Sequence, residues 1–151
     1  MITTEMKRYK STAWNFALDI PKRWHAFPPV SSNSPLEVIR FASKEEGNHL
    51  VIIFRSPRDP KKSLKEVCEQ TQQILAGKGF GNFSTTETTI GTRAALILEF
   101  DRSQDGGTWS CREYFVAEGT LQYILGFGTN SKDAMFDLYD RMAKSFEFSV
   151  E

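Results

Sequence analysis

Hydrophobic and polar residues alternate along the early part of this chain, which predicts β-strands. Between Trp14 and Ile20 every second side chain is large and apolar, so we expect one face of this strand to be buried. Residues 36–42 and 49–55 predict a hairpin that turns through residues 44–48. The second strand of that hairpin is apolar on both faces, which is typical of a sheet that is covered on both sides.

The same kind of pattern continues in the last third of the chain. Residues 92–101, 108–117 and 121–127 predict three strands joined by short turns that contain glycine. A Thr-rich segment, residues 83–90, predicts a more polar strand nearer an edge of the sheet. Because consecutive strands are joined by short turns, the predicted sheet is mostly antiparallel.

In two other segments the apolar residues recur with a period of about 3.6 residues, which is typical of amphipathic helices. Residues 64–75 place apolar side chains on one stripe. Ser63 and Glu66 match a capping box, in which the serine hydroxyl accepts a bond from a free backbone N–H at the helix start. Ser131 is predicted to cap a second helix that ends near residue 144, before a short strand-like tail of residues 145–148.

These elements and the composition together predict one compact unit. At 151 residues the chain is long enough to bury a core without a metal or a disulfide. We expect an α+β fold, with a mostly antiparallel β-sheet flanked by helices on both faces as a three-layer sandwich. A single domain of residues 1–151 is the predicted organisation.

The balance of charge and apolar runs excludes several classes of partner. Nineteen basic and nineteen acidic residues leave a net charge of zero, which argues against nucleic acid or an anionic membrane as the partner. The longest apolar runs, residues 50–54 and 94–98, are far shorter than the roughly 20 residues of a membrane helix. Residues 1–10 lack the apolar segment and cleavage site of a secretory signal, so we expect a cytoplasmic protein.

No catalytic constellation is recognisable, and we expect no catalytic residue, metal or cofactor. Residues 77–81 are rich in glycine, but they end a helix and precede a strand, the reverse of a phosphate-binding loop. Residues 101–106 resemble the start of a calcium loop, but Arg112 replaces the glutamate expected at its end. His25 and His49 are the only histidines, too few for a convincing metal site.

Several chemically active side chains interrupt the apolar strands and helices. Glu99 and Arg112 are expected to face each other across a hairpin as a structural ion pair, with Glu113 beside them. A buried carboxylate with a raised pKa would indicate function instead. Cys68 and Cys111 lack the spacing of a metal or redox motif and are predicted to be buried, reduced thiols.

Two polar segments supply the candidate ligand-binding or partner-binding residues. Trp24 and His25 are predicted to lie where the chain turns into a loop rich in Pro and Ser, and they could line a cleft with residues 31–35. Arg55 and Arg58 belong to a basic segment that could bind an acidic protein surface. The segment has no stacking aromatic residues, so a nucleic-acid groove is not favoured.

With these elements in order, nearly the whole chain resembles the PsbP/Mog-like fold family, which includes bacterial proteins of the domain class labelled DUF1795. The resemblance rests on packing and turn positions, which are Tyr9 with residues 14–24, the helix of residues 64–75, residues 91–94, the hairpin of residues 114–127 and residues 143–148. It implies an antiparallel sheet between helices and a largely non-enzymatic class of proteins. Members of this class are accessory subunits of photosystem II, regulators that bind the small GTPase Ran, and bacterial secretion chaperones that hold transmembrane segments of effectors.

The leading hypothesis is therefore a non-enzymatic cytoplasmic protein-binding module that acts as an adaptor, an assembly factor or a chaperone-like accessory protein. The partner protein and the oligomeric state stay open, and neither nucleic acid nor a membrane span is expected. The alternative is a small-molecule binder or minor hydrolase with a cleft near Trp24 and His25. A broad apolar patch on the sheet would favour the first hypothesis, and a deep pocket with convergent polar groups the second.

Overall fold

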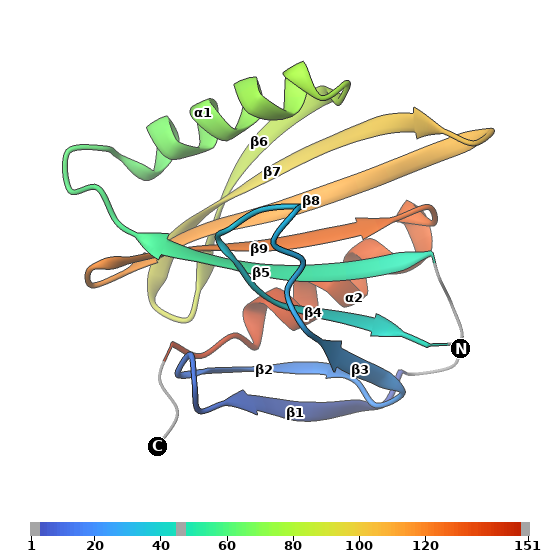
Figure 1. Ribbon diagram of the computed structural model, residues 1–151, viewed down its shortest axis with the longest axis horizontal. Coiled ribbons are helices and arrows are strands. Elements are labelled where there is room, and N and C mark those ends of the chain that lie inside the picture. The colour runs from blue at the N-terminus through green and yellow to red at the C-terminus, as the bar shows by residue number, and fades with distance from the viewer. Residues whose placement is uncertain (1–3, 45–47, 149–151) are drawn as a thin grey trace.

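The structure is a computed structural model that describes residues 4–44 and 48–148. Residues 45–47 of the predicted turn between the second and third predicted strands lie outside the described residues. The elements, in chain order, are β1 (Met6–Ser11), β2 (Phe16–Pro21), β3 (Trp24–Phe27), β4 (Glu37–Ser43), β5 (His49–Pro57), α1 (Leu64–Gly77), β6 (Gly81–Ile90), β7 (Arg93–Gln104), β8 (Gly107–Glu118), β9 (Leu121–Thr129) and α2 (Lys132–Lys144). Figure 1 shows their arrangement.

Seven of these strands form one antiparallel sheet in the order β3-β4-β5-β9-β8-β7-β6. Strands β6 to β9 follow one another through tight turns, as the sequence predicts. The β7–β8 turn has a positive φ at both central residues, Asp105 (46°) and Gly106 (77°), which the Asp-Gly pair tolerates and a type I′ hairpin requires. Because β5 pairs with β9, α1 lies in the connection that carries the chain from the middle of the sheet to its edge at β6.

The two helices cover opposite faces of the sheet. On one face α2 and the β1–β2 hairpin enclose a large core in which Phe16, Tyr114 and Tyr139 are fully buried. On the other face α1 packs over β6, β7 and β8, in a smaller core around Cys68 and Leu98. The predicted α+β fold, a mostly antiparallel sheet between helices, is therefore confirmed.

Two details of the predicted strands near residue 20 are wrong. The predicted strand from Trp14 begins only at Phe16, because Asn15 has a φ of 54° and belongs to a turn, which leaves Trp14 40% exposed. The predicted loop at Trp24 is instead the edge strand β3, which pairs with β4 from Trp24↔Ser43 to Phe27↔Arg40. Both segments are short, and tertiary pairing outweighs their local pattern.

The β1–β2 hairpin forms its own two-stranded sheet, and the tail of the chain after α2 attaches to it. Ala17 and Glu147 exchange two backbone hydrogen bonds of 3.0 and 2.8 Å in an isolated bridge. Arg8 donates to the Ser145 carbonyl at 2.8 Å and to Asp19 at 3.0 Å. The Phe146 ring stacks on Phe16, with ring centroids 5.3 Å apart. The predicted strand-like tail of residues 145–148 thus pairs with β2 through a single β-bridge.

The two helices differ at their first residues, and this difference gives a testable prediction. The Ser63 hydroxyl accepts a 3.1 Å bond from the Glu66 backbone N–H, as the predicted capping box requires. Ser131 holds the same position before α2 but makes no side-chain bond to the helix. We expect Ser63→Ala to lower the free energy of unfolding by about 1 kcal/mol. Ser131→Ala should lower it by less; equal losses in urea denaturation would contradict this view of the caps.

Candidate functional site

A trough runs along the face of the sheet that carries α1, where strand β9 has glycines at positions 126 and 128. Gly126 lies between Ile52 of β5 and Glu113 of β8, and Gly128 lies between Leu50 and Cys111 in the next row. Alternate residues of a strand point to the same face, so both glycines open the same surface. The sheet is therefore hollowed along β9, between two rows of larger side chains.

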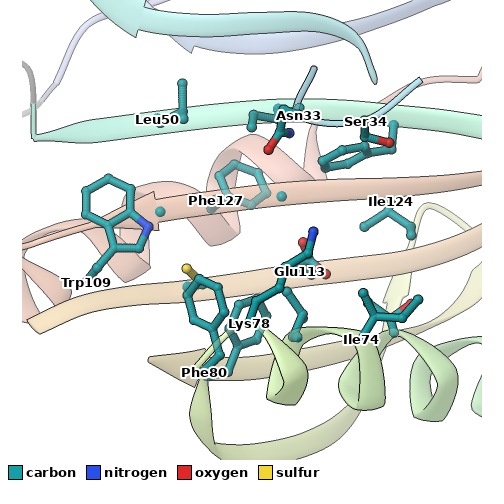
Figure 2. Close-up of a pocket in the computed structure, with 18 of the residues that line it drawn as sticks. Asn33, Ser34, Leu50, Ile74, Lys78, Phe80, Trp109, Glu113, Ile124 and Phe127 are labelled. Carbon is teal, nitrogen blue, oxygen red and sulfur yellow. The ribbon is translucent and has the colours of Figure 1, made fainter. Parts of the chain in front are cut away.

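The helix above this face covers only part of it, which leaves the trough open. Because α1 packs over β6, β7 and β8, the apolar side chains of β5 on that face are only half-buried. Ile74 of α1 is 61% exposed, and Leu36 on the opposite rim is 45% exposed. The resulting groove is a cavity of about 520 Å³. Figure 2 shows Ile74 on one side, Asn33 and Ser34 on the other, and Glu113 between them.

Among the described residues that line the groove, Glu113 is the one acidic side chain. Its Oε1 atom is buried and has no hydrogen-bond partner among the described residues. Burial raises the pKa of the carboxyl to about 7, and the positive charge of Lys78 at the end of α1 lowers it only in part. At neutral pH this carboxyl is therefore close to half-protonated, and the described part of the protein leaves its Oε1 acceptor unused.

Aromatic side chains border the same floor. An ideal Cβ on Gly126 would lie 3.3 Å from the ring of Phe54 and 3.4 Å from Glu113 Oε2, so the ring and the carboxyl converge over this glycine. The indole of Trp109 lies directly on Gly128, where a Cβ would come within 2.5 Å of it. Trp109 thus closes one end of the groove, as Figure 2 shows.

The two thiols near Glu113 are not nucleophiles at neutral pH. Cys68 and Cys111 are both buried and free, as predicted. Burial raises the pKa of both thiols, that of Cys111 to about 12, and the negative charge of Glu113 raises them further. A thiol must ionise to attack a substrate, and these stay protonated. Their contribution is to the packing between α1 and the sheet.

The structure separates Glu113 from the two charged residues that the sequence groups with it. Glu99 and Arg112 form the predicted cross-strand pair, with distances of 2.9 and 3.2 Å, and their side chains lie toward α2. Arg112 also donates to the Tyr114 hydroxyl at 3.2 Å, and that hydroxyl donates to Asp140 at 2.8 Å. This pair is built into the core face, whereas Glu113 points to the opposite face and lacks such partners.

The four residues singled out from the sequence are not brought together. Trp24 is 5% exposed and stacks on His49, with ring centroids 6.4 Å apart, while His25 is exposed on the edge strand β3. Arg55 lies toward the other end of β5, over the ring of Trp14 at 5.1 Å, and Arg58 follows that strand. None of the four lines the groove, which takes only Asn33 and Ser34 from the predicted loop.

Sequence reasoning overlooked Lys78, Trp109 and the two glycines of β9. One signal was present: Gly126 and Gly128 alternate inside a predicted strand, and glycine within a strand marks a close approach of other groups. Among the described residues no group of three or more metal-binding side chains could hold an ion. No helix in the described chain is both long and apolar enough to span a bilayer.

No family model matches this chain, and no curated protein matches it. Several solved structures, however, are similar to it. The chain is similar to cyanobacterial PsbP (CyanoP) from Synechocystis sp. PCC 6803, with a TM-score of 0.74 and 14% identity over 96% of this chain and 93% of that one.

Two further solved structures are similar to this chain at the same level of identity. One is LpqN, involved in cell envelope biogenesis of Mycobacterium tuberculosis, with a TM-score of 0.64 and 14% identity over 94% of this chain and 89% of that one. The other is PA94, a protein of unknown function from Pseudomonas aeruginosa, with a TM-score of 0.57 and 14% identity over 93% and 94%. At this identity the comparisons confirm the predicted PsbP-like fold and carry no activity to this chain.

Proposed function

We propose that this chain is a non-enzymatic accessory module that holds an apolar segment of a partner protein in the groove beside α1. The observation that carries this proposal is the exposure of apolar side chains on both rims, Ile74 at 61% and Leu36 at 45%. Apolar surface that lines an open groove between polar segments is typical of an interaction site. The groove lies on the sheet. The hypothesis of a protein-binding module, drawn from the sequence, also expects the apolar binding surface there.

The chemistry of the groove supports binding rather than catalysis. A hydrolase needs a nucleophile with a base beside it, or two acidic groups in defined roles. In the described part of the chain Glu113 is the one acidic group that lines the groove, and the thiol of Cys111 is held protonated by burial. A single carboxyl in an apolar floor can select a ligand, but it lacks the partners that bond cleavage requires.

Several finer expectations from the sequence are part of the proposal. They are the single-domain organisation over residues 1–151, the cytoplasmic location and the DUF1795-type or Mog-like membership. Trp24, His25, Arg55 and Arg58 stay predicted binding residues. Since they lie outside the groove, any contact they make would extend a partner's footprint along β3 and the end of β5.

The test uses two exposed apolar residues that differ in position. Ile74→Glu places a charge on the rim of the groove, whereas Val30→Glu places one on a loop residue that is 39% exposed and does not line the groove. We expect wild-type protein and Val30→Glu to capture the same protein from a native lysate, identified by mass spectrometry. Ile74→Glu should capture at least about tenfold less of this protein, which is the size of effect expected for a hot-spot residue. Equal capture by all three would contradict the proposal.

One observation favours a small-molecule binder as the second candidate. A cavity of about 520 Å³ falls within the range of roughly 300–1,000 Å³ that is typical of small-ligand sites. In that case native mass spectrometry of the purified protein would show a bound compound of low mass that Ile74→Glu loses. The cleft near Trp24 and His25 stays a separate prediction.

A further inference from the structure

We propose that Glu113 makes the groove selective for apolar segments that carry a lysine or arginine near their centre, by pairing with that cation on the floor of the groove. This inference rests on the proposed function and specifies the chemistry of the partner. It assigns a role to an oxygen atom that has no hydrogen-bond partner within residues 4–44 and 48–148.

The position of Glu113 suits such a role. The carboxyl stands over Gly126, where no side chain of β9 competes for space, and the ring of Phe54 converges on the same point. A buried acceptor without a donor is unfavourable, and a donor brought in by a ligand removes that cost. A cationic donor is favoured most, because hydrogen bonds between charged groups are about twice as strong as neutral ones. The apolar floor around the carboxyl would receive the flanking apolar residues of the partner.

The charges already around the groove compensate this carboxyl only in part. Arg40 of β4 pairs with Glu37, and Arg102 of β7 bonds to the Lys78 carbonyl and Gln104 while lying over the ring of Phe80. Among the described residues, Lys78 at the end of α1 is the one cation that lowers the pKa of Glu113. Burial still outweighs it, so Lys78 does not supply a full counter-ion.

The remaining titratable groups near the carboxyl also leave room for an external cation. Cys68 on α1 and Cys111 on β8 face it as neutral thiols, since the charge of Glu113 and burial both raise their pKa values. An acidic group on the partner would meet a like charge, which disfavours it. A metal ion would need more ligands than one carboxylate, and none are grouped here among the described residues. A lysine or arginine side chain, with an apolar stem and a charged end, fits both the walls and the floor.

The test uses three synthetic helical peptides of alanine and leucine with polar ends, identical except for a central lysine, norleucine or glutamate. Fluorescence anisotropy measures their affinity for wild-type protein, Glu113→Gln and Ile74→Glu. At pH 8 we expect wild-type protein to bind the lysine peptide at least about tenfold more tightly than the norleucine peptide. Glu113→Gln should lose this preference and bind the lysine and norleucine peptides with similar affinity.

The pH dependence gives a second readout. The ionised fraction of a carboxyl with a pKa of about 7 rises from about one tenth at pH 6 to about nine tenths at pH 8. The affinity for the lysine peptide should rise up to about ninefold over this interval, while that for norleucine stays level. Equal or tighter binding of norleucine by wild-type protein, or a lysine preference that survives in Glu113→Gln, would overturn this inference. If Ile74→Glu binds every peptide as wild-type protein does, it is instead the proposed function that fails.

Discussion

Replacing Glu113 by glutamine should stabilise this protein at pH 8 by up to about 3 kcal/mol and leave its stability nearly unchanged at pH 4.5. The folded protein holds the pKa of this carboxyl at about 7, above the ordinary value of 4.5. Ionising it in the groove is therefore costly, and glutamine keeps the shape while removing the charge. Urea denaturation of both proteins across this pH range measures the difference.

The sign follows from proton binding. Between pH 4.5 and 7 the folded protein keeps the Glu113 proton that the unfolded chain has lost, so the folded state binds more protons. The stability that this raised pKa contributes is fully present below pH 4.5, and it is lost as the pH rises to 7. Wild-type protein should thus weaken over this window relative to Glu113→Gln, and the two curves should run parallel above it.

A matched control is Glu99→Gln, on the opposite face of the same sheet. Glu99 accepts two bonds from Arg112, so its replacement removes the negative charge that pairs with a half-buried guanidinium. We expect this variant to lose about 1 kcal/mol of stability at neutral pH. If Glu113→Gln also loses stability at pH 8, the carboxyl has a partner after all, and the groove floor is not the site described here.

The second large effect is expected at Gly128. A Cβ at this position would lie 2.5 to 2.9 Å from three atoms of the Trp109 indole, closer than van der Waals contact permits. Gly128→Ala must therefore displace the indole or the strand, and we expect a loss of about 1–3 kcal/mol in the free energy of unfolding. Tryptophan fluorescence should report the displaced ring, and denaturation the loss.

Two controls isolate the contact. Gly126→Ala meets its neighbours at 3.3 Å or more, so its cost should be smaller. In a Trp109→Ala background, Gly128→Ala should become neutral or stabilising by about 0.5 kcal/mol, because alanine restricts the unfolded chain more than glycine does. An undiminished loss in that background would show that the strand, and not the indole, requires glycine.

Much of the fold could be predicted because local and tertiary preferences agree. The Asp105-Gly106 turn, the stripe of residues 64–75 and the alternation within β7 to β9 each point to a single structure. The prediction is wrong at Trp14 and at Trp24. Next to Trp14, a turn residue with a positive φ delays the start of the strand, and at Trp24 the chain forms a four-residue edge strand. Pairing between distant segments, and not the local sequence pattern, determines both features.

The candidate site was harder to predict because it depends on which part of the sheet α1 leaves uncovered. The apolar pattern on both faces of residues 49–55 correctly predicted a sheet between helices. It also implied that both faces of this strand are completely covered. In the structure β5 keeps half-buried apolar side chains beside the helix, and that gap is the groove. In the sequence, Glu113 interrupts an otherwise apolar strand. Its separation from Arg112 follows from residue parity, since neighbours in a strand point to opposite faces.

The attachment of the β1–β2 hairpin has a consequence for how the molecule opens. The hairpin shares no strand ladder with the large sheet, and its bonds to the rest include the Ala17–Glu147 bridge and the Arg8 contact to Ser145. Its release would free the tail after α2 and expose Phe146 together with Phe16. We therefore expect these two segments, which are far apart in the chain, to open together as one unit of local unfolding.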